Sequence, residues 1–159
     1  MKTFNLTRSK ATLMGTFVLA MAFPVLAAVG PTTEIVMKGN GYHITTTGPS
    51  GTLTPGFTMD AGLTNTITLK NEDMTPHEFV SKSFKHMDVV VSGEAEMVKD
   101  GAASGWKIMP GQTVVLKVTP KVGENFGGSW DVFYCPIHGK GNMRGEVIVA
   151  DSRTGTGAF

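Results

Sequence analysis

Short apolar-rich runs separated by Gly, Pro, Asn and Asp follow one another from Glu34 to Ala150, and almost no stretch has a helical period. In the run from 112 to 119, Val114, Leu116 and Val118 alternate with other side chains, as in a strand with one buried face. The pattern predicts strands over residues 34–38, 42–47, 64–70, 88–92, 112–119, 129–135 and 145–150. Residues 92–106 fit either one short helical turn or a loop.

Seven or eight strands in a chain of 159 residues predict an all-β fold, a two-sheet antiparallel Greek-key sandwich. The length allows one domain rather than two. We expect that domain to span 28–159, with an ordered core over about 34–150.

The N-terminus has the composition of a cleavable secretory signal. Lys2, Arg8 and Lys10 precede an uncharged apolar run over 11–26, which is shorter than the roughly 20 residues of a membrane-spanning helix. Small residues near Ala27 place the predicted cleavage after Ala27 or Ala28, so that 1–27 is removed. The protein is therefore expected to be periplasmic or otherwise exported, without a membrane span in the mature chain. An uncleaved anchor would leave the domain on the same side of the membrane.

The mature chain is close to neutral, with 11 basic and 13 acidic residues once the three basic residues of the signal are removed. The mature chain therefore lacks the excess of basic residues that is typical of nucleic-acid-binding proteins. A single cysteine, Cys135, excludes an internal disulfide, and a lone thiol in an oxidising compartment is exposed to oxidation unless something occupies it. A bound metal would do so.

Metal-ligating residues gather between the last two predicted strands. Cys135, His138 and Met143 follow one another at spacings Cys-x2-His and His-x4-Met, and His77 lies after the predicted strand 64–70. A sandwich brings distant loops together at one end. One thiolate, two imidazoles and a weak axial thioether are the ligands of blue-copper electron-transfer sites.

The same residues resemble a known family. YCPIHGKGNMRGEVIV (134–149) is similar to the copper loop and last strand of cupredoxins, with plastocyanin and pseudoazurin nearest in motif, and NEDMTPHEF (71–79) is similar to the segment around their first histidine. The resemblance implies one type 1 copper ion, with His77, Cys135 and His138 as strong ligands and Met143 as axial ligand.

Two positions depart from that pattern. Glu78 stands where many relatives have Asn or Ser, and Ile137 stands where many have Pro, with Pro136 one position earlier. Pro136 has no N–H and cannot donate a hydrogen bond to the cysteine sulfur. Fewer such bonds leave the thiolate more electron-rich, which changes the reduction potential.

The function that the resemblance implies is a one-electron shuttle and not an enzyme. Partners would be redox proteins such as cytochromes, oxidases or reductases, docking transiently on an apolar surface near His138 that includes Met74, Pro136 and Ile137. We expect a monomer. A copper-handling role in buffering, delivery, tolerance or metal uptake is the alternative, as is a fixed subunit of a larger redox complex. The seven methionines of the mature chain would serve copper handling if several clustered with His43 or His86.

Each residue also has a plainer interpretation. Cys135 could be a buried structural thiol or, with His138, a nucleophile pair, and structural zinc is disfavoured because methionine is an atypical zinc ligand. His43 is expected on a surface or edge, and His86 in a small basic surface or a docking patch. Glu72, Asp73 and Glu78 offer hard oxygen ligands, which would not explain the cysteine. Core positions are predicted for Trp106, Trp130 and Phe133.

Overall fold

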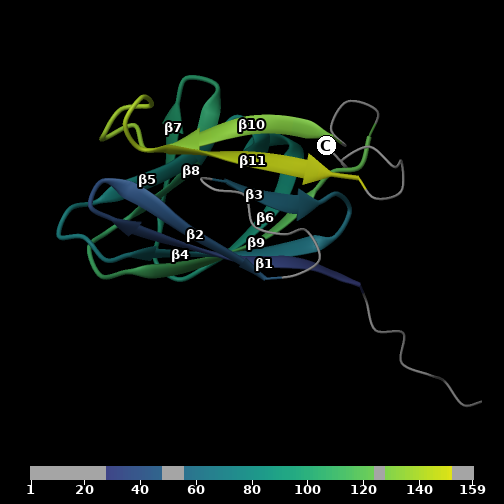
Figure 1. The fold of residues 1–159 in the computed structure, drawn as a ribbon, viewed down its shortest axis with the longest axis horizontal. Coiled ribbons are helices and arrows are strands. Elements are labelled where there is room, and N and C mark those ends of the chain that lie inside the picture. Colours follow the sequence, from purple (N-terminus) through teal and green to yellow (C-terminus); the bar gives the residue numbers. More distant parts are fainter. Residues whose placement is uncertain (1–27, 48–55, 124–127, 152–159) are drawn as a thin grey trace, which may run out of the picture.

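Two β-sheets lie face to face in the computed structural model, which describes residues 28–47, 56–123 and 128–151 (Figure 1). The five-stranded sheet has the order β2 (Gly41–Thr47), β1 (Val29–Lys38), β4 (Thr64–Asn71), β9 (Thr113–Pro120) and β6 (Met87–Ser92). The six-stranded sheet has the order β3 (Gly56–Asp60), β11 (Arg144–Ala150), β10 (Ser129–Tyr134), β5 (His77–Ser81), β8 (Ala103–Ile108) and β7 (Glu96–Asp100). A 3-10 helix, η1 (Ser83–His86), joins β5 to β6.

The core lies between the sheets and comes from the alternating positions of the strands. In β9, Val114, Leu116 and Val118 are fully buried, as the alternation predicted. Phe79 and Phe133 of the opposite sheet are also fully buried, with ring centroids 4.9 Å apart. The two-sheet all-β sandwich predicted from the sequence is confirmed.

All seven predicted strands are present, and the described residues contain four more, namely β3, β5, β7 and β8. Strands β3 and β5 are buried on nearly every residue, so their sequences do not alternate. The prediction of a helical turn or loop over 92–106 is wrong, because β7 and β8 form an antiparallel hairpin there. Gly105 allows β8 to lie against β5, since a Cβ at this position would clash with the Phe79 carbonyl oxygen.

The predicted antiparallel pairing holds for most neighbouring strands, with two exceptions. Strands β1 and β4 pair in parallel, as do β3 and β11, while the other pairs are antiparallel. Parallel neighbours need a crossover connection, and here intervening strands supply it. The alternation of side chains along a strand does not record the direction of its neighbour.

Three connections meet at one end of the sandwich (Figure 1). Strand β10 ends and β11 begins there, and His77 opens β5 at the same end. The two-residue turn between β1 and β2 is adjacent, because Met37 pairs with Asn71 at the end of β4. Both turn residues, Gly39 and Asn40, have positive φ angles of 61° and 59°, which suits a tight hairpin turn.

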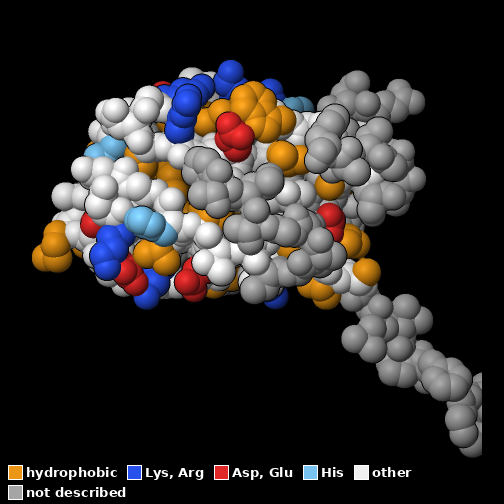
Figure 2. All heavy atoms as spheres, viewed as in Figure 1, with side chains coloured by type: hydrophobic (Ala, Val, Ile, Leu, Met, Phe, Trp, Pro, Cys, Tyr) orange, Lys and Arg blue, Asp and Glu red, His pale blue; other side chains and the backbone are white. Residues whose placement is uncertain are grey.

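Of the predicted core aromatics, Trp106 and Phe133 are buried, but Trp130 is 60% exposed. Trp130 lies on β10 opposite Ile148, on the outward face of the six-stranded sheet, so the core prediction is wrong for this residue. His43 is exposed on the edge strand β2, as expected, and His86 is exposed at the end of η1. Figure 2 shows hydrophobic side chains interspersed with charged ones on the visible face.

Within the described ranges, the structure has no helix long and apolar enough to span a membrane. The predicted signal over 1–27 and its cleavage point lie outside the residues that the structure describes.

Candidate metal centre

His77, Cys135 and His138 converge at the end of the sandwich where the three connections meet. One potential ligand atom from each residue lies within 4.8 Å of the others. His77 and Cys135 have no exposed surface, whereas His138 is partly exposed. The structure thus brings together three of the four residues that the sequence pointed to, from segments 58 positions apart.

The loop after β10 places Cys135 beside His138. Cys135 Sγ lies 3.3 Å from His138 Nδ1, and the His138 and His77 rings lie with centroids 4.7 Å apart and planes at 33°. Gly139 has a φ of 85°, which turns the chain back, and its carbonyl accepts hydrogen bonds from the amides of Asn142 and Met143. Backbone bonds within the loop therefore hold the thiol and one imidazole together.

Met143 closes the same loop. Its carbonyl oxygen accepts a hydrogen bond from the Cys135 amide at 3.0 Å, and its side chain is fully buried in the main core cluster. This position next to Cys135 is compatible with an axial thioether. Its role as a ligand stays a prediction.

His77 has one ring nitrogen engaged and one buried without a partner. Its Nε2 lies 2.8 Å from Asp73 Oδ2, while Nδ1 is buried and has no hydrogen-bond partner among the described residues. A carboxylate on one nitrogen favours a proton there and leaves the lone pair on the other nitrogen, as in metal-ligating histidines. A buried polar atom without a partner costs free energy unless a ligand satisfies it. The donor set and this nitrogen together fit a soft transition metal such as copper.

Asp73 is itself fixed by backbone groups. The amides of Gly39 and Asn40 in the β1–β2 turn lie 2.9 and 3.5 Å from its two carboxylate oxygens. Asn71 accepts a hydrogen bond from the Asp73 amide and donates to the carbonyls of Thr75 and Ile108. The hydrogen bond from the Gly39 amide is the chief cause that lowers the pKa of Asp73, with His77 also contributing.

The sulfur of Cys135 receives one amide hydrogen bond from a distant strand. Glu78 N donates to Sγ at 3.3 Å, across a sequence separation of 57 residues. Pro136 has no amide proton to offer, so the Glu78 amide supplies the backbone contact to the sulfur. The Glu78 carboxyl is partly buried, and desolvation raises its pKa.

The sandwich with a His–Cys–His group at one end is the arrangement that the resemblance implied. The chain has a cupredoxin-like fold. No family model matches this cupredoxin-like chain, and no curated protein matches it either.

Solved structures that match include variants of amicyanin. An oxidized variant is 19% identical, with 73% of this chain and 79% of that chain covered and a TM-score of 0.43. A Cu(I) form of another variant is 18% identical over 74% and 81% of the two chains, with a TM-score of 0.44. A reduced variant is 20% identical over 73% and 79%, with a TM-score of 0.43.

The acidic residues near His77 in this cupredoxin-like chain have defined partners. Glu72 lies 3.2 Å from Lys38 and 2.7 Å from Lys70, so its charge is paired on the surface. Sequence reasoning considered Asp73 only as a hard metal ligand and missed its contact with His77. A four-residue spacing within a loop gave no periodic signal for that contact.

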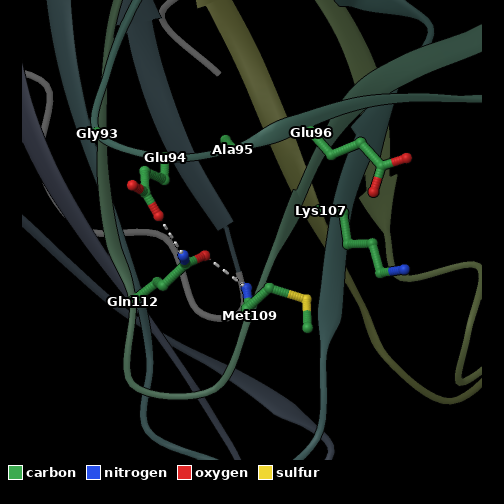
Figure 3. Close-up of a pocket in the computed structure, with 7 residues that line it drawn as sticks. All are labelled: Gly93, Glu94, Ala95, Glu96, Lys107, Met109 and Gln112. Carbon is green, nitrogen blue, oxygen red and sulfur yellow. Dashed lines mark hydrogen bonds between the residues drawn. The ribbon is translucent and has the colours of Figure 1, made fainter.

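One apolar side chain reaches solvent on each of the two loops that carry His77 and His138. Met74, three positions before His77 in the sequence, is 92% exposed, and Ile137, next to His138 in the sequence, is 49% exposed. A separate surface pocket is lined by residues of the β6–β7 connection, the first residue of β7, the end of β8 and the turn that follows β8 (Figure 3). There, Gln112 bridges Glu94 and the Met109 amide, and none of the three converging ligands lines the pocket.

Proposed function

We propose that this protein binds one copper ion as a type 1 site and transfers single electrons. His77, Cys135 and His138 are the strong ligands, and Met143 is the axial one. The observation that carries the proposal is the buried, unpartnered Nδ1 of His77 in the same group as the Cys135 sulfur and a His138 nitrogen. No residue that the structure describes satisfies that nitrogen, and a metal ion would.

Bound copper would supply a one-electron couple between Cu(II) and Cu(I). The protein supplies donors that suit both states, since thiolate favours the reduced ion and imidazole is tolerated by the oxidised one. Asp73 holds the His77 ring, and the turn at Gly139 holds Cys135 against His138. Ligand side chains held in this way would change their positions little when the copper ion gains or loses an electron. No bond of a substrate is made or broken, so the protein acts as a carrier and not as an enzyme.

Cys135 has no exposed surface at which it could attack a substrate, which argues against the nucleophile alternative. Structural zinc would leave Met143, buried directly beside Cys135, without a role. Both points favour copper with this ligand set.

Electrons would enter and leave at His138, the one partly exposed member of the group. The exposed Ile137 and Met74 give this end an apolar surface for weak, small contacts with redox proteins such as cytochromes, oxidases or reductases. We propose that the protein is an exported monomer. N-terminal sequencing of protein recovered from outside the cytoplasm tests the export, with Ala28 or Val29 as the expected first residue.

Copper titration of the purified mature protein tests the function. One equivalent of Cu(II) should give an intense visible thiolate-to-copper band and a reversible one-electron wave. Cys135→Ser should abolish the band, and His77→Ala should abolish or displace it, whereas His43→Ala is a matched control on an exposed histidine that should change neither. A band that survives in Cys135→Ser contradicts the ligand assignment. More than one tight equivalent, or copper that does not cycle, supports the copper-handling role instead.

A further inference from the structure

The backbone of Glu78 has no strand partner on the side that faces β10. Strand β5 pairs with β10 only at Val80 and Ser81, where the opposite residues are Tyr134 and Phe133. Two steps further along the same register, Pro136 would lie opposite Glu78, and proline has no N–H to donate. The Glu78 carbonyl therefore needs a donor from elsewhere, because buried backbone groups are rarely left unpaired.

Two side chains take the place of the missing strand. The Glu78 amide donates to Cys135 Sγ at 3.3 Å, and the Glu78 carbonyl accepts a hydrogen bond from the Tyr42 hydroxyl at 2.5 Å. A residue in an antiparallel ladder directs its N–H and C=O to the same side. The two hydrogen bonds therefore hold one short stretch of backbone between the sulfur and the phenol.

Tyr42 is well fixed for this contact. It lies on β2, in the sheet opposite β5, and its ring makes edge contacts with Phe133 at 5.1 Å and with Phe79 at 6.0 Å. Its hydroxyl thus links the two sheets next to the ligand group. Burial raises the pKa of Tyr42 well above its ordinary value, and the nearby Cys135 and Glu78 charges add to this, so the phenol stays a donor at neutral pH.

We propose that Tyr42 is a positioning residue of the copper site, which holds the Glu78 backbone so that its amide stays directed at the Cys135 sulfur. This inference rests on the proposed function. A hydrogen bond to the sulfur draws electron density from the thiolate, and a less electron-rich thiolate favours Cu(I) over Cu(II). Tyr42 therefore raises the reduction potential without touching the metal or a ligand atom.

The test compares Tyr42→Phe with Tyr134→Phe in the copper-loaded protein. Each substitution removes one phenol hydroxyl and keeps the ring. The Tyr134 hydroxyl donates a hydrogen bond to Asp100 Oδ2 at 2.7 Å, whereas the Tyr42 hydroxyl donates to the Glu78 carbonyl. Tyr42→Phe should lower the reduction potential by up to about 59 mV. This shift corresponds to about a tenfold loss in the preference of the site for Cu(I) over Cu(II). Its visible band should shift in energy, and the Glu78 amide should exchange its hydrogen faster. Tyr134→Phe should leave the potential, the band and the Glu78 exchange as in the wild type.

An unchanged potential and unchanged Glu78 exchange in a folded Tyr42→Phe protein would overturn the inference and leave Tyr42 as a packing residue. An equal shift in both variants would overturn it too, because loss of either phenol would then have the same effect. Should Tyr42→Phe not fold, exchange in the wild type decides: a Glu78 amide that exchanges as fast as in an unfolded peptide contradicts the proposed bond. A wild type without the intense band would refute the proposed copper function instead, so the two failures are distinct.

Discussion

Asp73 Oδ2 lies 2.8 Å from His77 Nε2 and thereby joins the candidate metal centre to the β1–β2 turn, whose amides bind the same carboxylate. The other nitrogen of His77 is buried and has no partner in the part of the chain that the structure describes. One carboxylate thus determines which nitrogen of the ring is free to bind a metal, although Asp73 belongs to no strand.

Asp73→Asn should weaken copper binding by about 10- to 100-fold, because partners of ligating histidines orient the ring and raise its basicity. Competition with a copper chelator measures this affinity. Glu72→Gln is the matched control, since it removes only surface ion pairs with Lys38 and Lys70 and should leave the affinity within about twofold. Equal losses in both variants would show that general negative charge, rather than the contact with His77, supports binding.

Met143→Leu should keep the copper but raise the reduction potential. Leucine fills nearly the same buried volume, yet it removes the thioether, whose electron donation favours Cu(II). Voltammetry measures the shift. Met87→Leu, at another buried methionine on β6, should leave the potential unchanged. Identical potentials for wild type and Met143→Leu would remove Met143 from the ligand set.

Both tyrosines should resist ionisation in the folded protein. Burial, followed by the hydrogen bond to Asp100, raises the pKa of Tyr134 to about 12, and the pKa of Tyr42 is also raised. An unfolded tyrosine has a pKa of about 10. The folded-state pKa is the higher one, so the stabilisation is fully present below pH 10 and is lost as the pH rises toward 12.

An absorbance titration of phenolate in the apo-protein measures this, with the same titration in denaturant as reference. The folded protein should show little phenolate at pH 10.5, where about half or more of the denatured protein's tyrosines are ionised. A folded-state midpoint near 10 for both residues would contradict the buried hydrogen bonds of Tyr42 and Tyr134.

Gly105→Ala should destabilise the fold by about 1–3 kcal/mol or more, because the added methyl group would clash with the Phe79 carbonyl oxygen and strand β8 would have to move away from β5. Gly123→Ala is the matched control, since no atom of the described residues lies within 4 Å of a Cβ there. Urea unfolding of the apo-proteins measures the difference. Since His77 opens β5, Gly105→Ala should weaken copper binding as well.

Sequence patterns predicted those strands that bury one face only. The alternation of Val114, Leu116 and Val118 in β9 is of that kind. The buried β5 and the largely polar β7 carry no such alternation, so they were not predicted. Trp130 was assigned to the core because aromatic residues usually are, but which face of β10 it occupies depends on the register with β11.

By itself, the sequence determined the all-β class and pointed to four ligand residues, His77, Cys135, His138 and Met143. Both results depend only on residue types and short sequence spacings, which the sequence contains directly. Only the tertiary structure decided what surrounds them. Asp73 on His77, the Glu78 amide on the sulfur and Tyr42 on the Glu78 carbonyl are contacts between separate loops and strands. These residues meet only after the two sheets have packed. Hydrogen bonds act over about 3 Å, and a local sequence pattern does not show which distant residues come that close together.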